Sequence, residues 1–281
     1  MRKKWMFIFM VILAVTAGFA LYIDRHGAAD VLGRDVGISA GQAILIDGKS
    51  GKVLYEKCAD EKAYPASTTK IMTALVTLET LRDHDSPIDQ VVEIPDRAVG
   101  VEGSSIYLEP GEKMTIEDLL YGLMLVSGND AATALAEIIG GSEEAFVGMM
   151  NEKARQLGCR GTNFTNPSGL FDEEHYTTAR DMAAISLEAM KDPVFREIVA
   201  AQGHASNREN KDYTNFYNKN KTISQYEGGT GIKIGYTTDS GRTLVASSSR
   251  GDRDMICVVM SAPDWFNDAY RLMDYGYANT K

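Results

Sequence analysis

Residues 64–70 read Tyr-Pro-Ala-Ser-Thr-Thr-Lys and open an apolar-periodic segment that predicts a helix at about 67–82. Ser67 and Lys70 are three residues apart, so a helix places them on one face, with the Lys70 amine within hydrogen-bonding reach of the Ser67 hydroxyl. A lysine whose pKa is lowered by burial can take the proton of a serine and make it a nucleophile. The first turn of a helix also offers free N–H groups to an oxyanion. The alternative, a serine that only caps a helix, stays open at this point.

A second motif, Ser127-Gly128-Asn129, lies between the apolar run 119–126 and the helical stretch 131–139. This position predicts a loop between two buried helices. A serine hydroxyl and an asparagine amide in such a loop can relay a proton and hold an amide substrate, but an ordinary inter-helix turn explains the same residues. The motif therefore adds to the first one only if the fold brings the two together.

A third motif, Lys233-Ile234-Gly235, lies in a run of β-branched and aromatic residues at 230–238, which predicts a strand. Gly235 lets another backbone approach closely, and Lys233 places a positive charge beside the same space. On its own this tripeptide carries little information.

Together the three motifs resemble the signatures of the penicillin-recognising serine D,D-peptidase superfamily, which read SxxK, SxN or YxN, and KTG. The resemblance is strongest for the low-molecular-weight D-alanyl-D-alanine carboxypeptidases and extends over about residues 38–281. The wider matching segments are Gln42–Asp47, Gly51–Glu56, Tyr64–Ala74, Asn166–Leu170, and His175 with Thr177–Ala183.

The resemblance implies an α/β fold, in which N- and C-terminal strands form one antiparallel sheet with helices on its faces. It also implies a reaction on peptidoglycan stem peptides that end in D-alanyl-D-alanine. In this reaction Ser67 attacks the carbonyl between the two D-alanines, Lys70 accepts its proton, and Ser127 passes that proton to the leaving D-alanine. Water then hydrolyses the acyl-enzyme, no metal or organic cofactor is required, and β-lactams acylate the same serine.

The substrate-binding residues follow from the same resemblance. Asn129 is expected to orient the peptide amide, and Lys233 to supply positive charge near the terminal carboxylate. The backbone N–H groups of Ser67 and Tyr236 are expected to form the oxyanion hole. The full substrate-binding set is Asn129, Lys233, Ile234, Gly235 and Tyr236.

One position departs from the family pattern, because Ile234 stands where the third motif has threonine. A hydrogen bond to a charged group contributes about 1.5–3 kcal/mol, so the missing hydroxyl is expected to slow the reaction by roughly one to two orders of magnitude. Two alternatives remain open: a class A β-lactamase, and a weakly active or non-catalytic peptidoglycan-binding homologue. The first needs a glutamate on a loop to activate water, and no clear counterpart lies between Asn129 and Lys233.

Composition is that of an ordinary globular chain, with 44% hydrophobic and 24% charged residues in 281. The net charge of −10 and the lack of a basic stripe argue against nucleic acid as a partner. The four histidines are not spaced as a metal site, and His175 is expected to be a loop or capping residue. Three cysteines are too few and too irregular to predict a structural disulfide, and Cys257 lies in an apolar run typical of a buried strand.

The N-terminus predicts export. Three basic residues, 2–4, precede an uncharged stretch at 5–23, which is long enough to span a bilayer, while 18–20 offers only a mediocre cleavage site. We therefore expect a signal peptide or membrane anchor at 1–23, a tether at 24–37 and a D,D-peptidase catalytic domain at 38–281. The catalytic domain is then expected on the outer face of the cytoplasmic membrane or in the cell wall.

The remaining elements follow from periodicity and turn residues. Strands are predicted at 42–47 and 52–57, with a second hairpin at 242–249 and 253–261. Thr178 and Asp181 have the spacing of a helix-capping pair. A final amphipathic helix at about 264–277 carries an aromatic stripe, including Trp265, that is expected to be core. Further helices are predicted at 116–126, 130–139, 142–157 and 179–190.

Overall fold

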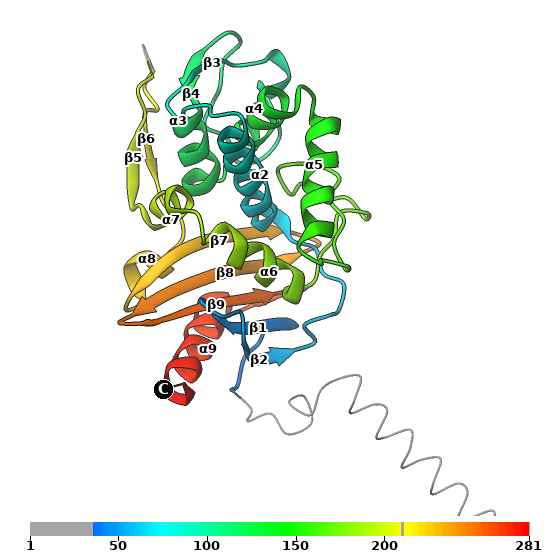
Figure 1. The fold of residues 1–281 in the computed structure, drawn as a ribbon, viewed down its shortest axis with the longest axis vertical. Helices are drawn as coiled ribbons and strands as arrows, with labels where there is room; N and C mark the ends of the chain where they lie inside the picture. The colour runs from blue at the N-terminus through cyan, green and yellow to red at the C-terminus, as the bar shows by residue number, and fades with distance from the viewer. Residues whose placement is uncertain (1–35, 209–210, 281) are drawn as a thin grey trace, which may run out of the picture.

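A five-stranded antiparallel sheet organises the molecule. The computed structural model describes residues 36–208 and 211–280. The strand order is β2-β1-β9-β8-β7, with most helices covering one face of the sheet and α9 the other (Figure 1). The strands are β1 (Gln42–Asp47), β2 (Val53–Lys57), β7 (Gly229–Thr237), β8 (Gly241–Arg250) and β9 (Arg253–Met260). The predicted α/β fold, with a sheet built from the two ends of the chain, is confirmed.

The N-terminal hairpin joins the sheet through β9. Strand β1 pairs antiparallel with β9 from Gln42 opposite Met260 to Asp47 opposite Met255. Side chains alternate along β1, so Ile44 enters the core under the helical layer while Leu45 enters the core under α9. The sheet therefore needs both ends of the chain, and it fixes the position of β7 at its edge.

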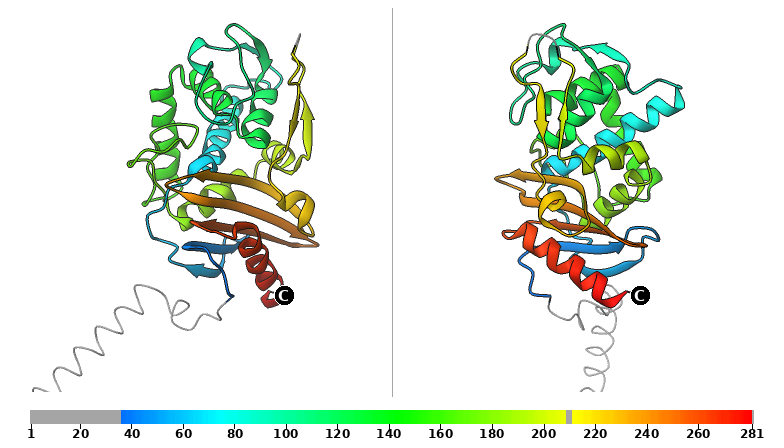
Figure 2. Two further views of the ribbon diagram at one scale, coloured as in Figure 1. Left: turned by 180° about the vertical axis from the view of Figure 1, so that it is seen from behind. Right: turned by 90° about the vertical axis from the view of Figure 1, so that its left-hand side faces the viewer.

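The helical layer contains most of the predicted helices (Figures 1 and 2). It comprises a 3₁₀ turn η1 (Ala66–Thr69), α2 (Lys70–Asp83), α3 (Ile116–Tyr121), a π-helical turn η3 (Gly122–Val126), α4 (Asn129–Gly140), α5 (Glu143–Gln156), α6 (Ala179–Ala189) and α7 (Pro193–Ala200). On the opposite face α9 (Trp265–Asn279) packs against β8 and β9. The smaller elements are η2 (Asp96–Ala98), α8 (Thr222–Gln225), and two hairpins, β3 (Val91–Glu93) with β4 (Lys113–Thr115) and β5 (Gly203–Ala205) with β6 (Asn215–Tyr217).

Helix α2 is the central helix of this layer. Its apolar side chains Ile71 and Met72 are fully buried, and Thr73 and Thr77 are buried as well. Thr73 donates its hydroxyl to the Pro167 carbonyl at 2.6 Å, and Thr77 donates to the Thr73 carbonyl at 2.8 Å. Because the buried hydroxyls of Thr73 and Thr77 both find carbonyl acceptors, the N-terminal half of the helix can be enclosed by protein.

The structure differs from the predicted elements in several places. The helix expected at 116–126 is α-helical only to Tyr121 and continues as the π-helical turn η3. Helix α7 was not predicted, although Asp192 caps it by accepting from the N–H groups of Val194 and Phe195, with Pro193 at its first position. The two small hairpins were also missed, because three-residue strands are too short for a period-two pattern to be recognised.

The predicted signal or anchor at 1–23 and nearly all of the predicted tether lie outside the described residues. Within the part of the chain that the structure describes, no helix is long and apolar enough to cross a membrane. Cys257 lies in β9 and is fully buried as a free thiol, as expected from its apolar context.

Candidate active site

The three sequence motifs meet where the first turn of α2 touches the edge strand β7. Turn η1 contacts β7 and β8, and the loop between η3 and α4 supplies the third side of the site. Figures 1 and 2 show the start of α2 reaching the sheet at the boundary between the helical layer and β7. Segments separated by more than 100 residues thus contribute to one site.

Lys70 lies at the centre of this site. Its side chain is completely buried, with Nζ 3.0 Å from Ser67 Oγ, 2.7 Å from Asn129 Oδ1 and 2.5 Å from the Ser168 carbonyl. Burial, followed by the positive charge of Lys233, lowers the pKa of Lys70 well below its usual value. A lysine with a lowered pKa beside a serine hydroxyl can act as its base. This arrangement matches the prediction made from the i, i+3 spacing.

The backbone around Ser67 is held in an unusual conformation. Ala66 has φ +47°, a left-handed conformation that costs a non-glycine residue about 1–3 kcal/mol. Two close approaches maintain it: a Cβ added to Gly169 would lie 1.9 Å from the Ala66 carbonyl oxygen, and one added to Gly235 would lie 2.9 Å from Ser67 N. Gly235 therefore brings β7 against the nucleophile, as its place in the third motif predicts.

Ser127 also has a left-handed backbone, with φ 70° and ψ 33°, directly after the π-helical turn η3. Its side chain is buried, yet Ser127 Oγ has no hydrogen-bond partner among the described residues. Buried hydroxyl groups are nearly always paired, so an unpaired one beside a candidate nucleophile is an acceptor and donor available to a ligand.

Asn129 connects the base to the loop that covers the site. Its Oδ1 contacts Lys70, its Nδ2 donates to the Glu102 carbonyl at 2.6 Å, and its backbone N–H donates to the Ser104 carbonyl at 2.7 Å. The side chain thus positions Lys70, and it keeps one further amide N–H for another partner. The neighbouring Asp130 anchors the same loop by accepting from the N–H of Ile106.

Lys233 is buried on the opposite side of the cleft, with Nζ 3.2 Å from its neighbour's carbonyl at Ile234. Burial, together with the positive charge of Lys219, lowers the pKa of Lys233 to about 7. Lys219 itself is exposed and donates to the Val126 carbonyl at 3.0 Å. Lys219 could not be predicted from the sequence, because it lies in a polar stretch with no motif of its own. The contact of the Ser168 carbonyl could not be predicted either, because backbone contacts leave no residue signature.

The other predicted residues have distinct surroundings. Ile234 is half-buried and packs against the core between the sheet and α9, whereas the Tyr236 side chain is 63% exposed. His175 is buried below the nucleophile and its Nε2 lies 2.8 Å from Thr69 Oγ1. Its Nδ1 accepts from the Thr165 N–H, which leaves the proton on Nε2, and burial lowers the pKa of His175 to about 4. His175 is therefore a neutral residue that supports the η1 turn.

A family model described as D-alanyl-D-alanine carboxypeptidase matches residues 29–264. The chain belongs to this family. D-alanyl-D-alanine carboxypeptidase DacF of Bacillus subtilis is 42% identical over 226 residues, which cover 79% of this chain and 57% of that protein. The D-alanyl-D-alanine carboxypeptidase of Streptomyces sp. strain K15 is 34% identical over 256 residues, covering 86% of this chain and 88% of its own. The chain thus spans a little over half of the Bacillus relative.

The solved structures give the same family. The crystal structure of D-alanyl-D-alanine carboxypeptidase from Mycobacterium tuberculosis has a TM-score of 0.80 and 32% identity, covering 86% of this chain and 92% of that one. A mutant of the Streptomyces K15 DD-transpeptidase has a TM-score of 0.79 and 33% identity, covering 86% of this chain and 98% of that one. Family membership favours a peptidase over the class A β-lactamase considered from the sequence.

Gly169→Ala tests whether the close approach to Ala66 positions the nucleophile. Because the added Cβ meets a backbone carbonyl at a residue with φ +83°, we expect a loss of at least about 2 kcal/mol in the free energy of unfolding by urea, and slower acylation by benzylpenicillin. The matched control is Gly148→Ala on the exposed face of α5, where an added Cβ meets nothing within 4 Å. That variant is expected to gain about 1 kcal/mol from helix propensity. Wild-type stability and acylation in Gly169→Ala would contradict this account.

Proposed function

We propose that this protein is a serine D,D-carboxypeptidase that removes the terminal D-alanine from peptidoglycan stem peptides through an acyl-enzyme on Ser67. The observation that carries the proposal is the buried Lys70 amine 3.0 Å from the Ser67 hydroxyl. In the first step, Ser67 Oγ attacks the penultimate D-alanine carbonyl while Lys70 accepts the hydroxyl proton. Family membership and the curated relatives named D-alanyl-D-alanine carboxypeptidase support this reaction.

The oxyanion of the tetrahedral intermediate is assigned to the N–H groups of Ser67 and Tyr236. The close approach of Gly235 to Ser67 N supports this assignment, because it puts the following residue of β7 beside the nucleophile. Preorganised backbone donors of this kind stabilise the charge where it develops.

Proton return to the leaving amine is assigned to Ser127. Its unpaired and buried Oγ supports a role in which the hydroxyl receives a proton from the lysine side and donates one to the departing D-alanine. Asn129 holds Lys70 through Oδ1, and its remaining amide N–H is assigned to the substrate's peptide carbonyl. Hydrolysis of the acyl-enzyme by water then restores Ser67.

The terminal carboxylate of the substrate is assigned to the positive side of the cleft. Lys233 supplies the nearest charge, and the exposed Lys219, whose charge acts on Lys233, adds a second one. Two cations facing one carboxylate offset part of the binding energy that is lost because Ile234 has no hydroxyl. β-Lactams, which present a carboxylate beside a reactive amide, are expected to occupy the same positions and acylate Ser67.

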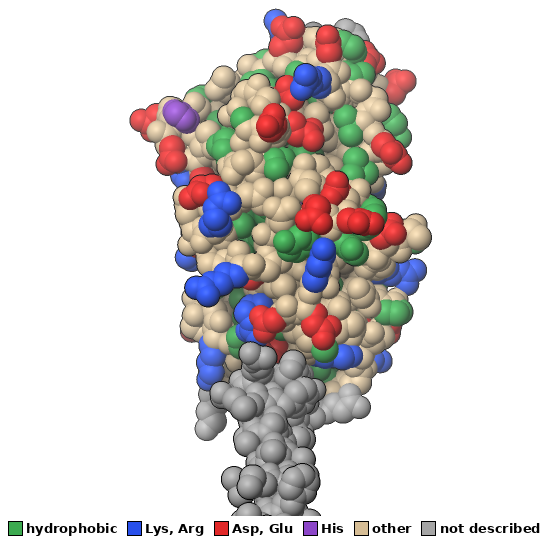
Figure 3. Space-filling view, turned by 90° about the vertical axis from the view of Figure 1, so that its right-hand side faces the viewer, with side chains coloured by type: hydrophobic (Ala, Val, Ile, Leu, Met, Phe, Trp, Pro, Cys, Tyr) green, Lys and Arg blue, Asp and Glu red, His purple; other side chains and the backbone are tan. Residues whose placement is uncertain are grey.

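The location of the enzyme is also a proposal. We infer an exported protein with a signal or anchor at 1–23, a tether at 24–37 and the catalytic domain at 38–281 on the outer face of the cytoplasmic membrane. The basic residues before the apolar stretch 5–23 support this inference. On the face in Figure 3, acidic side chains predominate towards the helical end, while basic and acidic side chains lie side by side towards the sheet end.

The decisive test of function is intact-mass analysis after incubation with benzylpenicillin. Wild-type protein is expected to gain one penicilloyl group on the peptide containing Ser67, and to release D-alanine from a peptide ending in D-alanyl-D-alanine. Ser67→Ala is expected to lose both. Lys70→Arg is expected to lose both as well, because a guanidinium stays protonated and cannot act as a base. Adduct formation at another residue, or adduct without D-alanine release, would point to a different enzyme or to a binding homologue.

Ile234→Thr tests the departure from the family motif. The substitution restores a hydroxyl in β7 at similar shape, so we expect the free energy of unfolding to change by about 1 kcal/mol. We expect kcat/KM for D-alanyl-D-alanine peptides to rise about ten-fold or more, which corresponds to one recovered hydrogen bond to a carboxylate. The matched control is Ile234→Val, which has no hydroxyl. An unchanged kcat/KM in folded Ile234→Thr would mean that other groups already hold the carboxylate.

Protease treatment of intact protoplasts tests the location. The catalytic domain is expected to be degraded by added protease while a cytoplasmic marker survives, because residues 24–281 are expected outside the membrane. Protection of the whole chain in sealed cells would exclude export. Mass analysis of the N-terminus then separates a retained anchor from a cleaved signal.

A further inference from the structure

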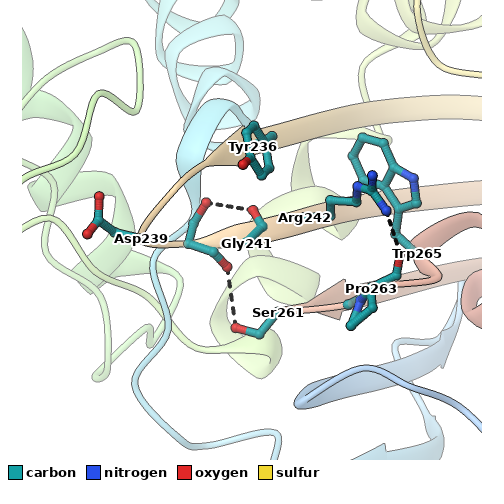
Figure 4. A pocket seen from close by; sticks show the side chains of 9 residues that line it. Tyr236, Asp239, Gly241, Arg242, Ser261, Pro263 and Trp265 are labelled. Atoms are coloured by element: carbon teal, nitrogen blue, oxygen red, sulfur yellow. Dashed lines mark hydrogen bonds between the residues drawn. The ribbon is translucent and has the colours of Figure 1, made fainter.

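A pocket of about 760 Å³ opens beside the proposed oxyanion hole, at the end of β7. It is formed by the turn between β7 and β8, the end of β9 and the start of α9 (Figure 4). Tyr236 links the pocket to the proposed site, because its side chain lines the pocket and its backbone N–H is assigned to the oxyanion hole. The residues that matter for its chemistry are Tyr236, Asp239, Arg242, Pro263 and Trp265.

The position of the pocket determines which part of a substrate can reach it. Two assignments define a direction along β7. Lys233 is assigned to the terminal carboxylate, and Tyr236 is assigned to the oxyanion hole. Continuing in that direction past Tyr236 leads away from the leaving D-alanine and into the pocket. The pocket therefore faces the acyl side of the scissile bond, which stays on the enzyme after D-alanine has left. This step rests on the proposed function.

The pocket offers an aromatic surface and a fixed positive charge. The Arg242 guanidinium lies over the Trp265 ring, 5.9 Å from its centroid, and Nη1 donates to the Pro263 carbonyl at 2.7 Å. An arginine has five N–H donors in a planar fork. A guanidinium that uses one of them therefore still has N–H donors that can pair with a carboxylate. The remaining wall is the exposed ring of Tyr236.

The one acidic group of the pocket is set apart from this charge. Figure 4 shows Arg242 and Trp265 on one side of Tyr236 and Asp239 on the other, with the Asp239 carboxylate directed away from them. The sequence analysis assigned Trp265 to the core. The ring is in fact half-buried: it packs against Phe266 on the core side and lines the pocket on the other.

We propose that this pocket binds the segment of the stem peptide on the N-terminal side of the scissile bond, with Arg242 pairing with a free carboxylate of that segment. Tyr236 and Trp265 pack against its apolar atoms. The pocket is thus a specificity subsite. Among peptides ending in D-alanyl-D-alanine, it favours long acidic substrates over short ones.

The test uses three peptides ending in D-alanyl-D-alanine. The first is a blocked tripeptide, the second is the same peptide extended at its N-terminal side by residues bearing a free carboxylate, and the third has that carboxylate replaced by an amide. Arg242→Gln is expected to lower kcat/KM about five-fold for the acidic peptide, the effect of a partly exposed ion pair, and less than two-fold for the other two. Arg242→Lys is expected to recover part of the loss. Arg155→Gln, at an exposed arginine on α5, is the matched control.

A binding measurement keeps this test separate from the proposed reaction. The chain has two tryptophans, so in full-length protein carrying Trp5→Phe and Ser67→Ala the emission reports on Trp265 alone. The acidic peptide is expected to change this emission at lower concentration than the amide peptide, and Arg242→Gln is expected to remove the difference. Equal binding of both peptides, or an equal effect of Arg242→Gln on all three substrates, would overturn the subsite. Absence of D-alanine release and of penicillin acylation in the wild type would instead refute the proposed function.

Discussion

The active site depends on keeping one lysine amine dry. Lys70 is completely enclosed, and a charged amine in such surroundings is strongly disfavoured, which lowers its pKa and leaves it able to accept a proton. Enclosure alone would leave a buried polar group unsatisfied, so the fold supplies Ser67 Oγ, Asn129 Oδ1 and the Ser168 carbonyl as partners. Each partner comes from a different segment, so the turn η1, the start of α4 and the loop at 166–170 must all be in place before this lysine can work.

The same requirement explains the strained backbone nearby. The chain enters the turn η1, which carries Ser67, through a left-handed residue, which here is Ala66 rather than a glycine. The cost of that conformation is offset by the packing of Gly169 and Gly235 against it, since any side chain at either glycine would push the turn away. The second left-handed residue, Ser127, leaves its hydroxyl unpaired inside the cleft. Strain and an unsatisfied group thus occur together at the reacting atoms, as is common in enzymes.

The sequence predicted the parts of this arrangement that depend on local order. The i, i+3 spacing of Ser67 and Lys70, the loop position of Ser127 and the strand around Lys233 all follow from short-range periodicity, and the antiparallel sheet followed from the family resemblance. Groups that act through the backbone or through surface charge left no pattern to find: the Ser168 carbonyl, the exposed Lys219, and the close approach that explains Gly169. The helix starting at Pro193 was missed although its aspartate cap and N1 proline are recognisable signals, whereas the short hairpin from Gly203 to Tyr217 has too few strand residues to be recognised.

The two buried lysines place opposite demands on one cleft. In the proposed reaction Lys70 must be neutral to accept a proton and Lys233 must be charged to attract a carboxylate, and the two repel each other when both are protonated. In the free enzyme, burial and Lys219 hold the pKa of Lys233 near 7, so its charge is only partly present at neutral pH. An unfolded lysine keeps its proton up to about pH 10.4, and the folded state is therefore increasingly favoured as pH rises from 7 towards that value. A substrate carboxylate favours the charged form of Lys233, because a negative charge beside this lysine raises its pKa. Once charged, Lys233 keeps the pKa of Lys70 low. Substrate binding itself therefore makes Lys233 the cation and leaves Lys70 as the base.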